Sequence, residues 1–108
     1  MKMNILKAEE VKEMIDQRKD FILAMVLDAE AFTKAHIPES LHVPDAESAS
    51  RLLPLDSKII VYCSDKGCAA SLQAYYQLES AGYRNIWRFA GGLMEWNEMG
   101  YPIVSSSS

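Results

Sequence analysis

Two runs of almost entirely apolar residues dominate the pattern along the chain. They extend from Phe21 to Leu27 and from Lys58 to Cys63. A strand with one face in solvent alternates apolar and polar residues, whereas a strand covered on both faces is apolar throughout. Both runs therefore predict buried strands. Shorter strands are predicted at Asn4 to Leu6, Leu41 to Val43 and Asn85 to Phe89.

Helical spacing of apolar residues recurs between these strands. From Ala8 to Gln17, apolar side chains share one face while charged side chains occupy the other. A second helical pattern runs from Ala69 to Ala81 and stops at Gly82, a residue that readily adopts the positive φ of a helix C-terminus. Shorter helices are predicted at Ala29 to Ala35, Ala46 to Leu53 and Leu93 to Met99.

The order of these segments predicts the fold class. Strands that alternate with helices are joined by crossover connections, which build a parallel sheet with helices on both faces. At 108 residues the chain is long enough for one such α/β domain and too short for two. The serines at 105–108 form a polar tail that we expect to be disordered.

Composition and charge narrow the classes of function. Apolar residues make up 49% of the chain and charged residues 24%, as in ordinary globular domains. A net charge of −4 without a basic cluster argues against nucleic acid as a partner. No apolar run approaches the ~20 residues that span a bilayer, and residues 1–16 mix charged with apolar side chains, unlike a signal peptide. These features predict a cytoplasmic protein without membrane contact.

Cys63 is the strongest candidate for a functional residue. Functional groups of parallel sheets gather beyond the carboxyl ends of the strands, and Cys63 closes a predicted central strand. The loop 64–68 leads into a helix, so its backbone N–H groups and the helix dipole favour an anion. We therefore expect the pKa of the Cys63 thiol to lie below the free value of about 8.5. Lys66 would add to this effect, and Asp65 would oppose it.

Two further segments carry a family pattern. Residues 32–44 read Phe-Thr-Lys-Ala-His-Ile-Pro and, after two residues, Leu-His-Val-Pro. Residues 82–103 begin with Gly-Tyr and continue through Phe-Ala-Gly-Gly-Leu-Met-Glu-Trp to Gly-Tyr-Pro-Ile. Together with the Cys63 loop, these segments resemble a single rhodanese-like domain, to which we assign residues 1–104.

This resemblance carries expectations for the fold and for the chemistry. It implies a central parallel sheet of about five strands, flanked by helices on both faces. It also implies a cysteine that accepts a sulfane sulfur and passes it to a nucleophile, and Cys63 matches that cysteine. The resemblance calls for no organic cofactor and no metal.

The chain departs from the family pattern at several positions. Family members commonly carry an arginine in the loop after the cysteine, where its guanidinium can hold a thiosulfate oxygen. Cys68 fills that place here, and residues 64–71 contain no arginine. Met25 and Leu27 replace both charges of a usual Asp-Val-Arg segment, and Ala35 replaces a usual glycine.

The leading hypothesis is an enzyme of the rhodanese type, a sulfurtransferase or sulfane-sulfur carrier. Cys63 would take sulfur from a small donor as a persulfide and pass it to a thiol of a small molecule or of a protein, acting as a monomer or weak dimer. The residues expected to surround the bound anion are Ser64, Asp65, Lys66, Gly67, Cys68 and Ala69.

The alternative hypothesis is a non-catalytic or redox-sensing module. Cys68 could act as a resolving thiol that forms a disulfide with Cys63, which requires the two Cα atoms to lie within about 7 Å. The same residue also suits a small packed position at the start of a helix. A phosphatase or arsenate reductase would need an arginine that the loop lacks. A zinc site from both cysteines, His36 and His42 lacks a C-x-x-C pair, so no metal is predicted.

Overall fold

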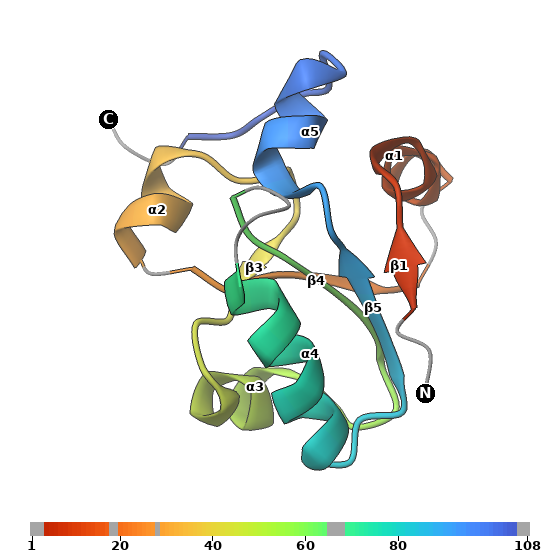
Figure 1. Cartoon of the computed structure of the whole chain (residues 1–108), viewed down its shortest axis with the longest axis vertical. Helices are drawn as coiled ribbons and strands as arrows, with labels where there is room; N and C mark the ends of the chain where they lie inside the picture. The colour runs from red at the N-terminus through yellow and green to blue at the C-terminus, as the bar shows by residue number, and fades with distance from the viewer. Residues whose placement is uncertain (1–3, 18–19, 28, 65–68, 106–108) are drawn as a thin grey trace.

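Within the residues that the structure describes, five parallel strands form one sheet at the centre of the molecule (Figure 1). The computed structural model describes residues 4–17, 20–27, 29–64 and 69–105. Across the sheet the strands are ordered β1 (Ile5–Leu6), β5 (Asn85–Phe89), β4 (Lys58–Tyr62), β2 (Ile22–Met25) and β3 (Leu41–His42). Each neighbouring pair is parallel. The central strand is therefore β4, and Cys63 follows directly at its carboxyl end.

Helices cover both faces of this sheet. One face packs against α3 (Ala46–Leu52) and α4 (Ala69–Ser80), which contact each other. The other face packs against α1 (Ala8–Asp16), α2 (Ala29–Lys34) and α5 (Gly92–Glu98). Figure 1 shows the α3/α4 pair apart from the α1/α5 pair, with the sheet between them. The expected α/β architecture of about five parallel strands with helices on both faces is confirmed.

Most observed elements are slightly shorter than the predicted ones, whereas β5 has its predicted bounds and α5 is shifted by one residue. The first long apolar run, 21–27, contributes only Ile22–Met25 to the ladder, and the second, 58–63, contributes Lys58–Tyr62. The predicted helix over 69–81 forms as Ala69–Ser80. These differences lie at the ends of elements, where the last residues make fewer ladder or helical hydrogen bonds.

Successive residues of the central strand serve two separate apolar cores. Ile59, Val61 and Cys63 belong to the cluster beneath α3 and α4, while Ile60 and Tyr62 belong to the cluster beneath α1 and α5. All five are at most 1% exposed. Side chains alternate between the faces of a strand, so a strand covered on both faces must be apolar at every position. This arrangement places Cys63 on the α3/α4 face.

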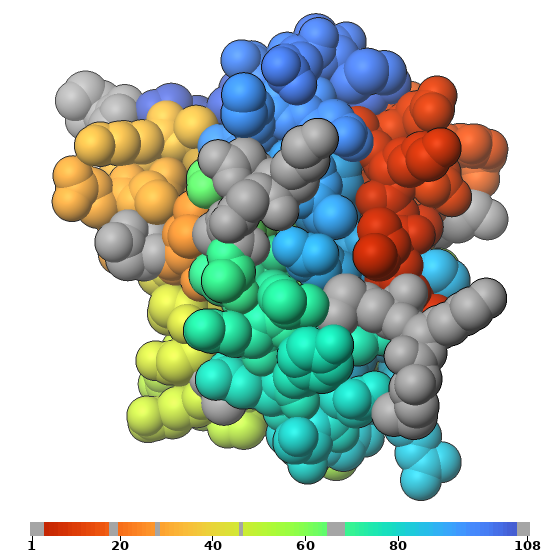
Figure 2. All heavy atoms as spheres, viewed as in Figure 1, coloured from red at the N-terminus to blue at the C-terminus, as the bar shows by residue number. Residues whose placement is uncertain are grey.

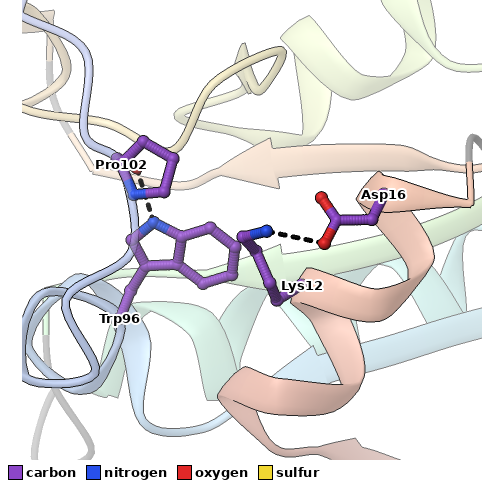
Figure 3. A network of polar contacts seen from close by, with 4 residues as sticks. All are labelled: Lys12, Asp16, Trp96 and Pro102. Atoms are coloured by element: carbon purple, nitrogen blue, oxygen red, sulfur yellow. Dashed lines mark hydrogen bonds and ion pairs between the residues drawn. The ribbon is translucent and has the colours of Figure 1, made fainter.

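The C-terminal segment closes the α1/α5 side of the molecule. Trp96 is fully buried, and its indole Nε1 donates a hydrogen bond to the Pro102 carbonyl at 2.7 Å (Figure 3). Lys12 of α1 forms an ion pair with Asp16, with 2.6 Å between Nζ and Oδ2. Figure 3 shows this pair beside Trp96. Further along, Val104 pairs with His36 in an antiparallel bridge. The segment after α5 is thereby attached both to its own helix and to the chain after α2.

No helix within the described ranges combines the length and the apolar character that a bilayer crossing requires.

Candidate functional site

Cys63 lies at the carboxyl end of the central strand and is only 1% exposed. Its neighbours on the same face are apolar residues of the α3/α4 core, including Val61 two positions earlier. The backbone N–H of Val26, from the adjacent strand, donates to the carbonyl of Tyr62 at 3.1 Å, so pairing with β2 continues up to the residue before the cysteine. Strand pairing therefore fixes the position of Cys63 at the carboxyl end of the central strand.

The first turn of α5 holds the segment after the strand. The backbone N–H of Leu93 donates to the Cys63 carbonyl at 2.9 Å, and that of Met94 donates to the Ser64 carbonyl at 2.7 Å. The first N–H groups of a helix have no partner within the helix, and here two carbonyls of the candidate site satisfy them. The backbone at Cys63 is thus held by hydrogen bonds to α5. The Cys63 side chain lies on the opposite face, in the apolar core beneath α3 and α4.

Two glycines make this close approach of α5 feasible. Gly92 has a φ of +64°, a conformation that costs a non-glycine residue roughly 1–2 kcal/mol. A Cβ on Gly91 would lie 2.6 Å from the Cβ of Glu95, well inside van der Waals contact. The two glycines therefore permit the tight turn from β5 into α5.

The hydroxyl of Tyr62 anchors the loop that follows α2. This hydroxyl accepts a hydrogen bond from the Ile37 backbone N–H at 3.0 Å and lies 2.8 Å from the Ser40 hydroxyl. Burial raises the pKa of Tyr62 to about 12, so the group stays protonated at physiological pH. Tyr62 thereby fixes a family-pattern segment to the strand end that carries Cys63. A tyrosine in an otherwise aliphatic run was the signal in the sequence, and sequence reasoning missed it.

The two histidines of that segment make structural contacts. The His36 ring stacks on Phe32 with centroids 3.9 Å apart, and its Nδ1 lies 2.7 Å from the Phe32 carbonyl oxygen. His42 Nε2 lies 2.7 Å from the Leu27 carbonyl oxygen. Among the described residues, His, Cys, Asp and Glu side chains form no group of three that could hold a metal.

Arg88 of β5 is a cation on the same sheet face as Cys63, and sequence reasoning missed it too. Its Nε donates to the Ser71 hydroxyl at 2.9 Å, and Ser71 lies in the first turn of α4 with no exposed surface. Arg88 is directly opposite Val61 in the β4/β5 ladder. A charged residue inside a strand between the apolar Ile86 and Phe89 was the available signal.

A small cleft opens between α3 and α4 and reaches Val61, two residues before Cys63. Its volume is about 150 Å³, and its floor consists of small apolar residues of β2 and β4. Asp45, Gln73 and Gln77 also line it and are exposed. Asp45 caps α3, and the hydrogen bond from the Ser48 backbone N–H holds the pKa of Asp45 below its ordinary value.

The structure describes only part of the predicted anion loop. Ser64 is exposed and lies next to Cys63, and Ala69 is exposed as the first residue of α4. The other predicted loop residues lie outside the described residues: Asp65, Lys66, Gly67 and Cys68. The proposed role of Cys68 as a resolving thiol for Cys63 therefore stays a prediction.

A family model described as Rhodanese-like domain matches residues 7–99. The chain belongs to the rhodanese-like domain family. Its fold is that of other such domains, because the solution NMR structure of a rhodanese-like domain from Anabaena sp. matches 97% of this chain and 80% of that one, with a TM-score of 0.84 and 24% sequence identity. The crystal structure of a Bacillus halodurans protein matches 95% of this chain and 77% of that one, with a TM-score of 0.88 and 22% sequence identity.

Curated relatives of this rhodanese-like domain carry different names. A protein of Allochromatium vinosum named sulfurtransferase is 26% identical over 104 residues, which cover 94% of this chain and 95% of that protein. An HTH-type transcriptional regulator of Mycobacterium tuberculosis is 32% identical over 95 residues, which cover 84% of this chain and 42% of the regulator. Sequences of this family thus occur both in a stand-alone sulfurtransferase and in a larger regulator.

Two of the departures from the family pattern lie at the end of β2 and just after it. Met25, at one of the two usual charged positions, is fully buried in the α1/α5 core and pairs with Tyr62 across the sheet. Leu27, at the other, is half-buried and packs against both cores. Apolar packing therefore occupies the strand end where the family usually carries two charges.

Proposed function

We propose that this domain is a sulfurtransferase or sulfane-sulfur carrier whose nucleophile is Cys63. The observation that carries the proposal is the position of Cys63, directly after the central strand and shortly before α4, with its backbone clamped by α5. The family membership and the sulfurtransferase of similar length support it. The partners proposed are a small sulfur donor and a thiol acceptor, either small or carried by a protein.

The proposed reaction consists of two displacements that balance without an external oxidant. In the first, a lone pair of the Cys63 thiolate forms a bond to the sulfane sulfur of the donor, and the donor remnant leaves with the electron pair of the broken bond. In the second, an acceptor thiolate attacks the outer sulfur of the persulfide, and the electron pair returns to Cys63. The backbone N–H groups of loop 64–69 are the proposed anion cradle in both steps. The reducing cytoplasm is the compartment we propose, because it keeps cysteine reduced.

The proposal is tested by intact mass spectrometry after incubation with thiosulfate or with a low-molecular-weight persulfide. We expect one added sulfur atom, which disappears on addition of a thiol acceptor. Cys63→Ser should abolish the adduct, and Cys68→Ser is the matched control that should retain it. If no donor adds sulfur to the wild-type protein, the proposal is wrong.

A second candidate is a redox-sensing module, favoured by the similarity to a transcriptional regulator and by the second thiol in the sequence. As a redox sensor, the domain would react with peroxide, which oxidises the Cys63 thiol to a sulfenic acid and is reduced to water. The Cys68 thiol would then attack the Cys63 sulfur, form a disulfide and release a second water molecule. Mild peroxide treatment should give a species that is two hydrogens lighter and that dithiothreitol reverses. A reversible disulfide without any sulfur transfer would favour this candidate over the first.

A further inference from the structure

The Arg88 side chain lies on the same face of the sheet as Cys63. Ile86, two positions before Arg88, belongs to the same apolar core as Cys63, and side chains two apart along a strand share a face. The ladder places Arg88 opposite Val61, two residues before Cys63 on the adjacent strand. With a rise of about 3.3 Å per residue and strands about 4.8 Å apart, the Cα atoms of Arg88 and Cys63 are roughly 8 Å apart.

Ser71 directs the Arg88 side chain toward the start of α4. The Arg88 Nε donates to the Ser71 hydroxyl at 2.9 Å. Ser71 is the third residue of α4 and lies two residues after the predicted anion loop, 64–69, in the sequence. Figure 2 shows α4 covering the lower part of this face of the molecule. The guanidinium is therefore held between β5 and the first turn of α4, on the side of the helix where the chain arrives from Cys63.

Arg88 retains most of its hydrogen-bonding capacity for a ligand. A guanidinium has five N–H donors, and the contact with Ser71 uses only one of them. Within the described ranges, no carboxylate lies within 4 Å of it, since both ion pairs there belong to lysines. Arg88 is half-buried, and its remaining donors can hold an oxyanion in a bidentate contact.

The geometry points to Arg88, oriented by Ser71, as the binding group for the oxyanion end of the sulfur donor. This inference rests on the proposed function and deepens it, because it supplies from β5 the guanidinium that residues 64–71 lack. The ligand class is a small dianion with a sulfur oxyanion at one end and a sulfane sulfur at the other, such as thiosulfate. When the Cys63 thiolate bonds to the sulfane sulfur and the S–S bond breaks, sulfite leaves with that electron pair from the Arg88 side.

The simpler alternative is that Arg88 only attaches α4 to β5. In that case its loss would lower the free energy of unfolding and would affect every sulfur donor alike. A binding role would instead affect donors with an oxyanion and spare donors without one. The nature of the donor therefore separates the two roles.

Binding is measured with the full-length Cys63→Ser protein, which cannot cleave thiosulfate. Isothermal titration of thiosulfate into Cys63→Ser and into Cys63→Ser/Arg88→Met should show about a tenfold weaker Kd in the double variant, as expected for one charge-assisted bidentate contact. Cys63→Ser/Arg84→Met is the matched control, because Arg84 is exposed and precedes β5 at the opposite end of the strand. An unchanged Kd in the Arg88 double variant would overturn the inference.

Turnover separates this inference from the proposed function. With Cys63 intact, Arg88→Met should raise KM for thiosulfate about tenfold and leave the rate of persulfide formation from cysteamine persulfide, a zwitterion with no oxyanion and no net charge, within twofold. Equal losses with both donors would overturn the inference and indicate a structural role. Absence of sulfur addition to the wild type from either donor would instead contradict the proposed function itself.

Two conservative variants guard against a folding defect. Arg88→Lys keeps the positive charge but lacks the planar guanidinium that binds an oxyanion through two hydrogen bonds. It should therefore bind thiosulfate more tightly than Arg88→Met and more weakly than the wild type. Ser71→Ala keeps a small residue in the helix and removes only the group that orients Arg88, so it should raise KM for thiosulfate less than Arg88→Met does. If both variants fold and neither changes KM for thiosulfate, Arg88 does not bind the donor.

Discussion

The backbone N–H of Ile37 donates to the hydroxyl of Tyr62 at 3.0 Å, in the buried interior between the sheet and the loop after α2. The two residues are 25 positions apart, and the same hydroxyl lies 2.8 Å from that of Ser40. Tyr62 is also the last residue of β4, so one side chain connects the loop to the position that precedes Cys63. The loop and the strand end should therefore lose stability together.

Removing this hydroxyl should destabilise the fold. Tyr62→Phe leaves the Ile37 N–H buried without its acceptor, which costs about 1–3 kcal/mol. Urea denaturation followed by circular dichroism should show this loss as a lower midpoint with an unchanged slope. Tyr76→Phe is the control, because Tyr76 is 53% exposed and should leave the midpoint within error. Equal midpoints for wild type and Tyr62→Phe would show that the hydrogen bond contributes nothing net.

The same hydroxyl should make stability depend on alkaline pH. Burial raises the pKa of Tyr62 to about 12 in the folded state, above the unfolded value of about 10. The unfolded chain therefore releases this proton first, so the contribution of the neutral hydroxyl is complete below pH 10 and is lost as pH rises toward 12. The free-energy difference between wild type and Tyr62→Phe should shrink across that window. A constant difference from pH 9 to pH 12 would contradict the raised pKa.

The architecture was predictable because apolar patterning reports burial directly. The uninterrupted apolar run before Cys63 indicates a strand covered on both faces, and Ile59 and Ile60 do face opposite cores. Cys63 was also placed correctly at the end of the central strand, since that position follows from the element order alone. Its proposed chemistry depends on the loop amides and remains a prediction.

The polar contacts around Cys63 were not predictable in the same way. The Arg88 contact with Ser71 joins residues 17 positions apart, and the Tyr62 contact with Ile37 spans 25. Periodicity shows which face a residue occupies, but it carries no information on which polar groups meet across two elements. Such pairs depend on strand register and on helix position, which the folded structure alone supplies.

Glu39 occupies a backbone conformation that suits glycine. The Ser40 backbone N–H donates to the Ile37 carbonyl at 3.1 Å, which closes a turn with Pro38 second and Glu39 third. Glu39 has a φ of +69°, the positive value that a type II turn requires at its third residue. A side chain there costs roughly 1–2 kcal/mol.

Glu39→Gly should therefore stabilise the protein by about 1 kcal/mol after the extra chain entropy of glycine is subtracted. For a domain of this size the melting temperature should rise by roughly 4–8 °C, measured by calorimetry. Glu39→Ala is the matched control, because it removes the charge but keeps the Cβ, and it should give no such gain. A gain of the same size from alanine would show that charge, and not backbone strain, limits stability at this turn.

Restoring one family charge alone should be severely destabilising. Met25 is fully buried among apolar residues of the α1/α5 core, including Ile60 and Trp96. Met25→Asp would bury a carboxylate where Leu27 has replaced its usual basic neighbour, and an unpaired buried charge costs several kcal/mol or forces the group to become neutral. We expect a loss of at least about 3 kcal/mol in urea denaturation at pH 7, with partial recovery toward pH 5 as the carboxylate takes up a proton. Met94→Asp is the control, since Met94 is 56% exposed and the charge stays hydrated. If Met25→Asp proved as stable as Met94→Asp, the strand end would have to contain polar groups that pair with the new carboxylate, and apolar packing would not explain why this domain lacks the family's charged pair.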